Sequence, residues 1–203
     1  MYLKRLIISS LLILSVFINM KAEIKNSEFF PIRASNNYNA NPFSLKTNIL
    51  PWLTATPNIG VEFAFENKWS TDLDIMFAPW KISEKYSLKT IAILPEIRYW
   101  FKNNISGSFI NIHFSAAWYN LRFNRYRYQD NDNPLLGVGL GYGYRLNISS
   151  RFGMEFTIGA GYVILRYDRF YNKENGALID SRKTSYWGID RLGISLVYYI
   201  SNL

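Results

Sequence analysis

The residues of this chain that could do chemistry are ionisable side chains set at every second position of otherwise apolar stretches. Glu96 and Arg98 alternate with Ile97 and Tyr99, and the spacing recurs along the chain. Successive side chains of a β-strand point to opposite faces, so these charges share one face. Burying them is costly unless opposite signs meet, so we predict a salt-bridged polar network inside a closed sheet. Its nine predicted members are Lys46, Glu62, Asp72, Asp74, Glu96, Arg98, His113, Arg145 and Glu155.

The sequence leaves other roles open for these charged residues. A proton path or a small-ion pore would also place charges in a lumen. The only histidine, His113, would suit a lipid-modifying enzyme at a barrel rim if a nucleophile and an orienting acid lay beside it. It comes early in a strand that we expect to rise outward, so we predict that it lies low in the barrel and is not catalytic. With one histidine and no cysteine, we predict no metal site and no cofactor.

Two stretches resemble ligand-binding motifs but lack their spacing. Glycines occupy every second position of residues 137–143, whereas dinucleotide binding needs G-x-G-x-x-G before a helix. We expect these glycines to give room for long side chains from the opposite wall or to permit strong coiling of the strands. Residues 130–133 (DNDN) begin like a calcium loop, but Leu135 and Gly141 stand where that loop needs glycine and glutamate. We therefore predict a turn there.

Two clusters interleave arginines with aromatic residues, in residues 122–128 and 166–171. Both fall next to predicted connections at the outer rim, where guanidinium groups could hold lipopolysaccharide phosphates. A solvated rim with aromatic anchors is the alternative. In a chain without an export signal the same pattern would suggest nucleic acid, but here we predict no nucleic acid partner. The predicted rim contacts are Arg122, Arg125, Arg127, Arg166 and Arg169.

The first 22 residues read as a signal peptide. Lys4 and Arg5 precede an apolar stretch, residues 6–18, and Ala22 supplies the small residue before a cleavage site. An uncleaved anchor is the alternative. Cleavage removes three basic residues and no acidic one, so the formal charge falls from +8 to +5, which fits a surface beside anionic lipid headgroups. Residues 23–43 are rich in asparagine, and we predict a periplasmic lead-in that is partly disordered.

Eight later segments alternate apolar and polar residues and are predicted to be strands. After the N-terminus, no run approaches the roughly 18 uncharged residues that a membrane helix needs. The strands are predicted over residues 44–51, 57–65, 69–78, 88–101, 108–123, 134–147, 152–167 and 186–200.

The connections between these strands are predicted to be short at residues 66–68, 102–107 and 147–151 and longer at 79–87, 124–133 and 168–185, with a brief first one at 51–57. Outer-membrane barrels have short periplasmic turns and longer external loops, so this pattern puts both termini in the periplasm. Aromatic residues near the strand ends predict belts at the headgroup level: Trp52, Trp69, Trp80, Trp100, Trp118, Tyr119, Tyr142, Tyr144 and Trp187. We therefore predict an all-β fold over residues 44–203, an eight-stranded antiparallel up-and-down transmembrane β-barrel. A soluble barrel with core aromatics is the alternative.

Several ordered stretches resemble a family of Bacteroidota outer-membrane β-barrel proteins, designated domain of unknown function 3575. They are residues 46–52 (KTNILPW), 57–62 (PNIGVE), 77–80 (FAPW), 94–100 (LPEIRYW), 139–144 (GLGYGY) and 167–170 (YDRF). The resemblance implies a small outer-membrane barrel and brings no catalytic residues. Members are similar to proteins found beside fimbrial or OmpA-like components, which implies surface assembly as a context.

The sequence thus favours a plugged, non-enzymatic outer-membrane barrel with a structural or surface-assembly role, such as an adhesion accessory. Its expected partners are outer-membrane lipids and lipopolysaccharide, fimbrial or OmpA-like surface proteins, and the barrel-assembly machinery, which would read a last strand such as residues 193–200. A rim-located lipid-modifying enzyme and a small-ligand-binding barrel stay open as alternatives.

Overall fold

The structure is a computed structural model that describes residues 43–102 and 105–200, without the side chains of residues 130–132. The predicted signal peptide and all of the predicted lead-in except Phe43 lie outside the described residues. The described part is all-β apart from one helical turn. Its elements are β1 (Phe43–Asn48), α2 (Ile49–Trp52), β2 (Asn58–Glu66), β3 (Trp69–Lys81), β4 (Tyr86–Trp100), β5 (Gly107–Phe123), β6 (Tyr126–Asn147), β7 (Phe152–Tyr171) and β8 (Leu178–Tyr199).

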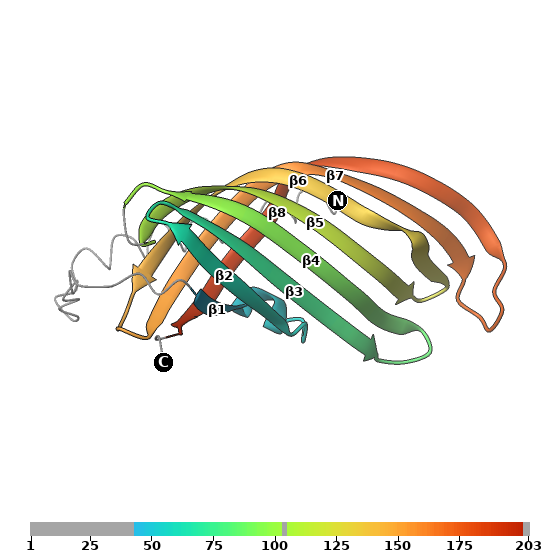
Figure 1. The fold of residues 1–203 in the computed structure, drawn as a ribbon. Helices are drawn as coiled ribbons and strands as arrows, with labels where there is room; N and C mark the ends of the chain where they lie inside the picture. Colours follow the sequence, from blue (N-terminus) through green and yellow to red (C-terminus); the bar gives the residue numbers. More distant parts are fainter. Residues whose placement is uncertain (1–42, 103–104, 201–203) are drawn as a thin grey trace, which may run out of the picture. The chain divides into compact units, whose positions relative to one another are not determined.

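The eight strands form one antiparallel sheet in which each strand pairs with the next. β1 also pairs with β8, from Ser44 opposite Tyr199 to Asn48 opposite Ser195, so the hydrogen bonds run around a closed barrel (Figure 1). The predicted strand number and up-and-down order are therefore confirmed. In the described ranges, no helix is long and apolar enough to cross a membrane.

The prediction of three long loops is wrong, because strands fill most of those segments. β6, β7 and β8 run for 22, 20 and 22 residues, against 6 residues in β1. Figure 1 shows β5 to β8 running well past the ends of β1 and β2. In the extension, residues 126–129 of β6 pair with residues 168–171 of β7. This ladder satisfies backbone groups that a loop would leave to water. The end of the barrel that these extensions form is called the long end below.

The Asp/Asn-rich segment 130–133 lies within β6 and does not form the predicted turn. Tyr119 of β5 pairs with Asp130, but Ala117 pairs with Leu135. Four residues of β6, 131–134, therefore lie opposite the single residue Trp118 of β5, which is three more than in a regular ladder. Such a bulge reverses which residues of the strand face inward. Beyond it, Tyr126 and Tyr128 lie on the inner face, together with their β5 partners.

The first predicted strand ends at Asn48, before the expected residue 51, because the Asn48 side chain begins α2. Its Oδ1 accepts hydrogen bonds from the backbone N–H groups of Leu50, at 3.1 Å, and Ile194, at 3.2 Å. Its Nδ2 donates to the Leu192 carbonyl at 3.3 Å. One side chain therefore caps the helical turn and occupies the edge of β8 where β1 stops pairing.

The glycine stripe of β6 makes room for side chains of the neighbouring strand. Phe109, Asn111, His113 and Ser115 of β5 pair with the four glycines of the stripe in turn. A Cβ on Gly143 would lie 2.2 Å from the Phe109 ring, and one on Gly139 would lie 2.5 Å from His113 Nε2. The predicted role as space for side chains is confirmed, but these side chains come from β5, where we expected the opposite wall.

We predict that Gly143→Ala lowers the free energy of unfolding by about 1–3 kcal/mol, because overpacking a filled interior forces displacements. Phe109 is fully buried, and its ring centroid lies 4.5 Å from that of Trp100, so it has no room to yield. Urea unfolding of detergent-folded protein measures the effect. The cost should shrink in a Phe109→Leu background, and an equal cost in both backgrounds would exclude Phe109 as the obstacle.

Candidate functional site

Seven of the nine predicted lumen residues form one buried ion network across the barrel, called the central network below. Their side chains are at most 2% exposed. Strand alternation turns each of them inward, and the pairing registers bring them to one level: Glu62 lies opposite Asp72, Asp72 opposite Glu96, and Arg145 opposite Glu155. The members are Lys46, Glu62, Asp72, Glu96, Arg98, Arg145 and Glu155.

Arg98 is the hub of the central network. Its guanidinium lies 3.2 Å from Glu62 Oε1, and 3.0 Å from both Asp72 Oδ2 and Glu155 Oε2. It also pairs with Glu96. Lys46 Nζ bridges two of the same acids, at 2.6 Å from Asp72 and 3.2 Å from Glu155. A planar guanidinium with five donors suits this role, because it can serve several carboxylates in fixed directions.

Aromatic rings close the central network on one side. Arg145 contacts Glu62 and donates from Nε to Glu155 at 2.9 Å, while its guanidinium carbon lies 4.8 Å from the Trp100 ring centroid. Arg98 lies 4.7 Å from the Phe109 ring centroid. These contacts place the two buried guanidinium groups, those of Arg98 and Arg145, against an aromatic face as well as against carboxylates.

Three residues of the predicted aromatic belts turn inward. Trp100 is fully buried, and its indole nitrogen donates to Ser70 Oγ at 2.9 Å. Trp80 and Tyr119 also lie on the inner faces of β3 and β5 by alternation, and Trp80 donates to the carbonyl of Ala55. The belt prediction is wrong for these three because it used proximity to strand ends and ignored the period of two.

The other two predicted residues, Asp74 and His113, form a second group with two residues that the sequence prediction missed. Arg191 Nη2 lies 2.9 Å from Asp74 Oδ2 and 3.3 Å from Glu96 Oε2, which joins the two groups. His113 Nε2 lies 3.1 Å from the Asp190 carboxylate, and Nδ1 lies 3.0 Å from Asn111 Oδ1. The strand pairing jumps from Ile189 to Arg191, so Asp190 is an extra residue in β8. This bulge lets Asp190 and Arg191 both face inward, which strict alternation forbids.

The two groups together hold more negative than positive charge. Four cations, Lys46, Arg98, Arg145 and Arg191, face six carboxylates, those of the central network plus Asp74 and Asp190. The formal charge is therefore −2 with a neutral His113. Both ring nitrogens of His113 lie within hydrogen-bond distance of oxygen atoms.

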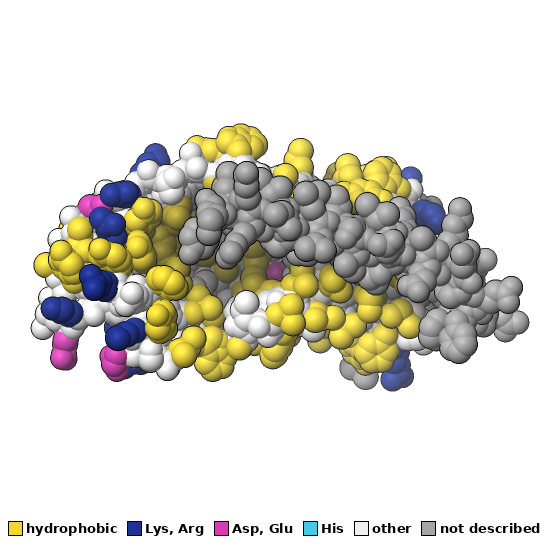
Figure 2. Space-filling view, turned by 180° about the vertical axis from the view of Figure 1, so that it is seen from behind, with side chains coloured by type: hydrophobic (Ala, Val, Ile, Leu, Met, Phe, Trp, Pro, Cys, Tyr) yellow, Lys and Arg dark blue, Asp and Glu magenta, His cyan; other side chains and the backbone are white. Residues whose placement is uncertain are grey.

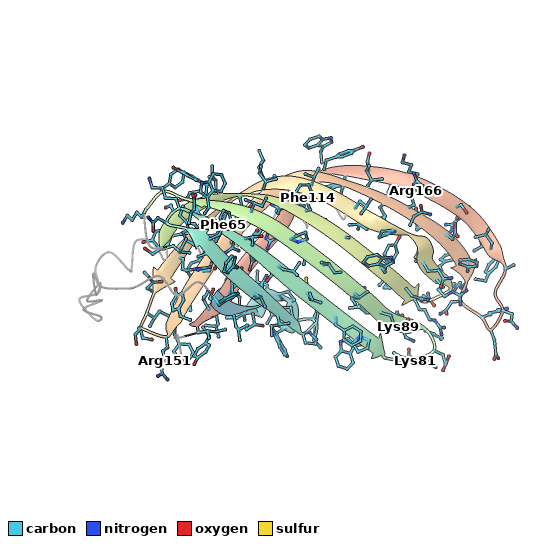
Figure 3. The ribbon with its side chains drawn as sticks, viewed as in Figure 1. Phe65, Lys81, Lys89, Phe114, Arg151 and Arg166 are labelled. Carbon is cyan, nitrogen blue, oxygen red and sulfur yellow. The ribbon has the colours of Figure 1, made fainter. Side chains whose placement is uncertain are left out.

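The faces opposite these charges carry exposed apolar side chains. Ile112 is 49% exposed and Leu140 is 67% exposed, whereas Arg98 is 0% exposed. Figure 2 shows hydrophobic side chains over much of the visible face and Lys and Arg gathered at its left end. Phe114, labelled in Figure 3, stands on the outer side of β5 midway along the barrel.

The five predicted rim arginines all lie in the extensions of β5 to β7 or the β5–β6 turn. Arg122 lies opposite Arg127, and Arg127 opposite Phe170, so these residues share the outer face. Arg166 Nη1 donates to Asn133 Oδ1 at 3.1 Å, and Arg125 is exposed in the β5–β6 turn. Arg169 differs, because it faces inward and pairs with Asp180 at 2.9 Å. Arg122 also lies 4.0 Å from Glu84, whose pKa is lowered by a hydrogen bond from Lys81.

We predict that Arg98→Met lowers the free energy of unfolding by about 3–5 kcal/mol, because it leaves several buried carboxylates without their cation. Arg98→Lys should recover little, since one ammonium cannot reach all four acids. The matched control is Arg151→Met, an exposed arginine labelled in Figure 3, which should change stability by no more than about 0.5 kcal/mol. Equal losses in urea unfolding for Arg98→Met and Arg151→Met would contradict a structural role for the central network.

The chain matches the family described as "Protein of unknown function (DUF3575)" over residues 27–200. No curated protein and no solved structure matches the chain. The match confirms the family that the ordered stretches resemble, while the Bacteroidota origin and the outer-membrane location implied by that resemblance stay predictions. With all but the two ends of its 203 residues matched, the chain belongs to the DUF3575 family.

Proposed function

We propose that this chain is a small outer-membrane barrel with a plugged polar interior and a structural or surface-assembly role. The observation that carries the proposal is the sidedness of its strands over residues 43–79, 91–118, 136–164 and 187–200. Apolar rows stand exposed on the outside, and a seven-residue ion network is buried inside. A soluble barrel has the opposite arrangement, with polar side chains outside and apolar side chains inside. In a bilayer the outer rows meet hydrocarbon, and a closed sheet leaves few backbone groups unpaired.

The plug supports a non-conducting role. Eight strands enclose a space that side chains can fill, and here Arg98, Arg145 and Trp100 cross it with side chains at most 1% exposed. The outer-face arginines Arg122, Arg127 and Arg166, with Arg125 in the turn, are proposed to contact lipopolysaccharide phosphates. The barrel-assembly machinery is the proposed partner during insertion, and fimbrial or OmpA-like surface proteins are proposed partners afterwards.

A lipid-modifying enzyme built around His113 has less support. In the described part of the chain, the hydrogen bonds of His113 go to Asn111 and Asp190, and neither supplies a hydroxyl that the imidazole could activate for acyl transfer. The His113 side chain is also only 3% exposed. Incubation with lipid A and mass spectrometry tests this alternative, since a product that disappears in His113→Gln would replace the structural role by an enzymatic one.

Cell fractionation tests the location. We predict that the chain sediments with outer membranes, stays there in alkaline carbonate, and dissolves only with detergent. Release into the periplasmic fraction without detergent would contradict the proposal and favour a soluble barrel.

Two arginine substitutions on one strand test the lipid-facing surface. Ile112→Arg should cost about 2–4 kcal/mol of folding free energy in lipid vesicles, because it puts a charge on the outer face at mid-strand. Asn120→Arg lies on the same face of β5 beyond Trp118 and should cost about 0–1 kcal/mol. Similar costs for both variants would exclude a depth-dependent lipid contact.

Planar-bilayer recordings test the plug. The wild-type barrel should show no steady conductance of porin size, because charged and aromatic side chains fill the lumen at the level of Arg98. An ohmic pore of that size would rule out a sealed interior.

A further inference from the structure

The polarity of the two barrel faces reverses along the strands. On the outer face of β7, Ile164 is followed by Arg166 and Asp168, and on β8 Trp187 gives way to Ser185 and Lys183. The inner faces change in the opposite direction. Above the His113 and Arg191 level, leucine and valine predominate, interspersed with threonine and tyrosine, until charges return at Arg169, Asp180 and Arg182. Toward the long end, the sheet thus has a polar outside and an apolar inside.

The apolar inner face of this end forms what we call the inner trough. It spans β4 to β8, and its strand partners place the side chains on one face, as in Ala117 opposite Leu135 and Val163 opposite Tyr186. Each lining residue is only half-buried. The aliphatic lining is Leu88, Leu94, Leu121, Leu135, Val163 and Leu165.

No core of the described residues fills the trough. In residues 43–102 and 105–200, the buried hydrophobic cluster consists of Trp100, Ile105 and Phe109 and lies against the central network. Farther out on the inner face, tyrosine rings contact one another, with Tyr128 and Tyr167 centroids 5.7 Å apart. A half-buried aliphatic inner face that extends past the apolar outer band needs an occupant to remove it from water.

The trough opens sideways. β8 pairs with β1 only from Ser195 to Tyr199, so residues 178–194 of β8 have a strand partner only in β7. β3 pairs with β2 only up to Met76, although it continues to Lys81. The seam between β8 and β3 reaches the long end, so in the proposed membrane it opens the trough at the level of the lipid headgroups, next to the hydrocarbon.

The long end also carries the whole positive surplus of the exported chain. Residues 81–89, 120–133 and 166–183 hold 11 basic and 6 acidic residues, and the rest of residues 23–203 holds nine of each. In the trough itself, Arg169 and Arg182 share the single carboxylate of Asp180. Figure 3 shows Lys81, Lys89 and Arg166 at this end. The complement of an aliphatic trough with a basic mouth is an amphiphile with an anionic head.

We propose that the inner trough binds the hydrocarbon chain of an anionic membrane lipid, which enters through the seam between β8 and β3. The chain lies on the aliphatic lining, and the head stays at the basic mouth near Arg182 and Arg169. The proposal rests on the membrane barrel proposed above, because the seam must face lipid. It assigns a ligand site distinct from the outer-face contacts of Arg122, Arg127 and Arg166.

Hexadecyl phosphate is the probe, added to the full chain in octyl glucoside and followed by native mass spectrometry. We expect one saturable adduct per chain, at least tenfold weaker binding of octyl phosphate, and none of inorganic phosphate. Raising NaCl from 50 to 500 mM should weaken hexadecyl phosphate severalfold and leave hexadecanol unchanged, because salt screens the head alone.

Neighbouring residues on opposite faces give the matched variants. Leu165→Asn, on the inner face, should weaken binding at least tenfold, whereas Ile164→Asn, on the outer face, should leave it within twofold. Ala117→Phe fills the trough from β5 and should also abolish the adduct. The heat-dependent gel shift of a folded barrel checks that each variant folds.

Equal effects of Leu165→Asn and Ile164→Asn, or no saturable adduct, would overturn the site. Binding that needs deletion of residues 23–42 would assign the trough to the chain's own N-terminal segment instead. Fractionation separates this failure from that of the membrane barrel, since a chain that stays in outer membranes without binding the probe refutes only the trough.

Discussion

The need to pair buried charges constrains the whole barrel. Lys46, Arg98, Arg145 and Arg191 come from β1, β4, β6 and β8, and their carboxylate partners come from β2, β3, β4 and β7. A slip of one residue in any of these strands would turn its charged side chain outward and leave partners unpaired inside. The central network therefore fixes the strand register more strictly than apolar packing could, since apolar side chains tolerate substitution if volume is kept.

Small residues in β6 and β7 make this polar interior possible. His113, Asn111 and Phe109 all project from β5 over glycines of β6, and Asp190 projects toward Gly161. A side chain at those glycine positions would displace the groups that orient His113 and support Arg98. The glycines are thus part of the ion network's geometry even though they contribute no charge, and they explain why a lumen of eight strands can hold Trp100 and Phe109 together with two guanidinium groups.

Strict alternation is the reason why the lumen residues could be predicted from the sequence. Glu96 and Arg98 point the same way because an unbroken strand has a period of two. The same rule failed where strands carry extra residues. Asp190 sits at the β8 bulge, and the β6 bulge turns Tyr126 and Tyr128 inward. The strand extensions were missed because asparagine, arginine and tyrosine there have the composition of loops, and only pairing with neighbours makes them strands. Asn48 ends β1 through a tertiary bond to β8 that no local pattern encodes.

The unpaired edge of β8 lies where the outer face of the barrel changes from apolar to polar. Hydrocarbon does not tolerate a strand edge with free N–H and C=O groups. Where β1 stops, the Asn48 side chain bonds to Ile194 and Leu192, and α2 with the following turn continues the wall as far as Trp80, which donates to Ala55. Beyond that point β8 turns to Ser185, Lys183 and Ser181 on its outer face, residues suited to water and headgroups. In the proposed outer-membrane barrel, the long end can therefore remain open, because only the apolar part of the wall has to exclude hydrocarbon.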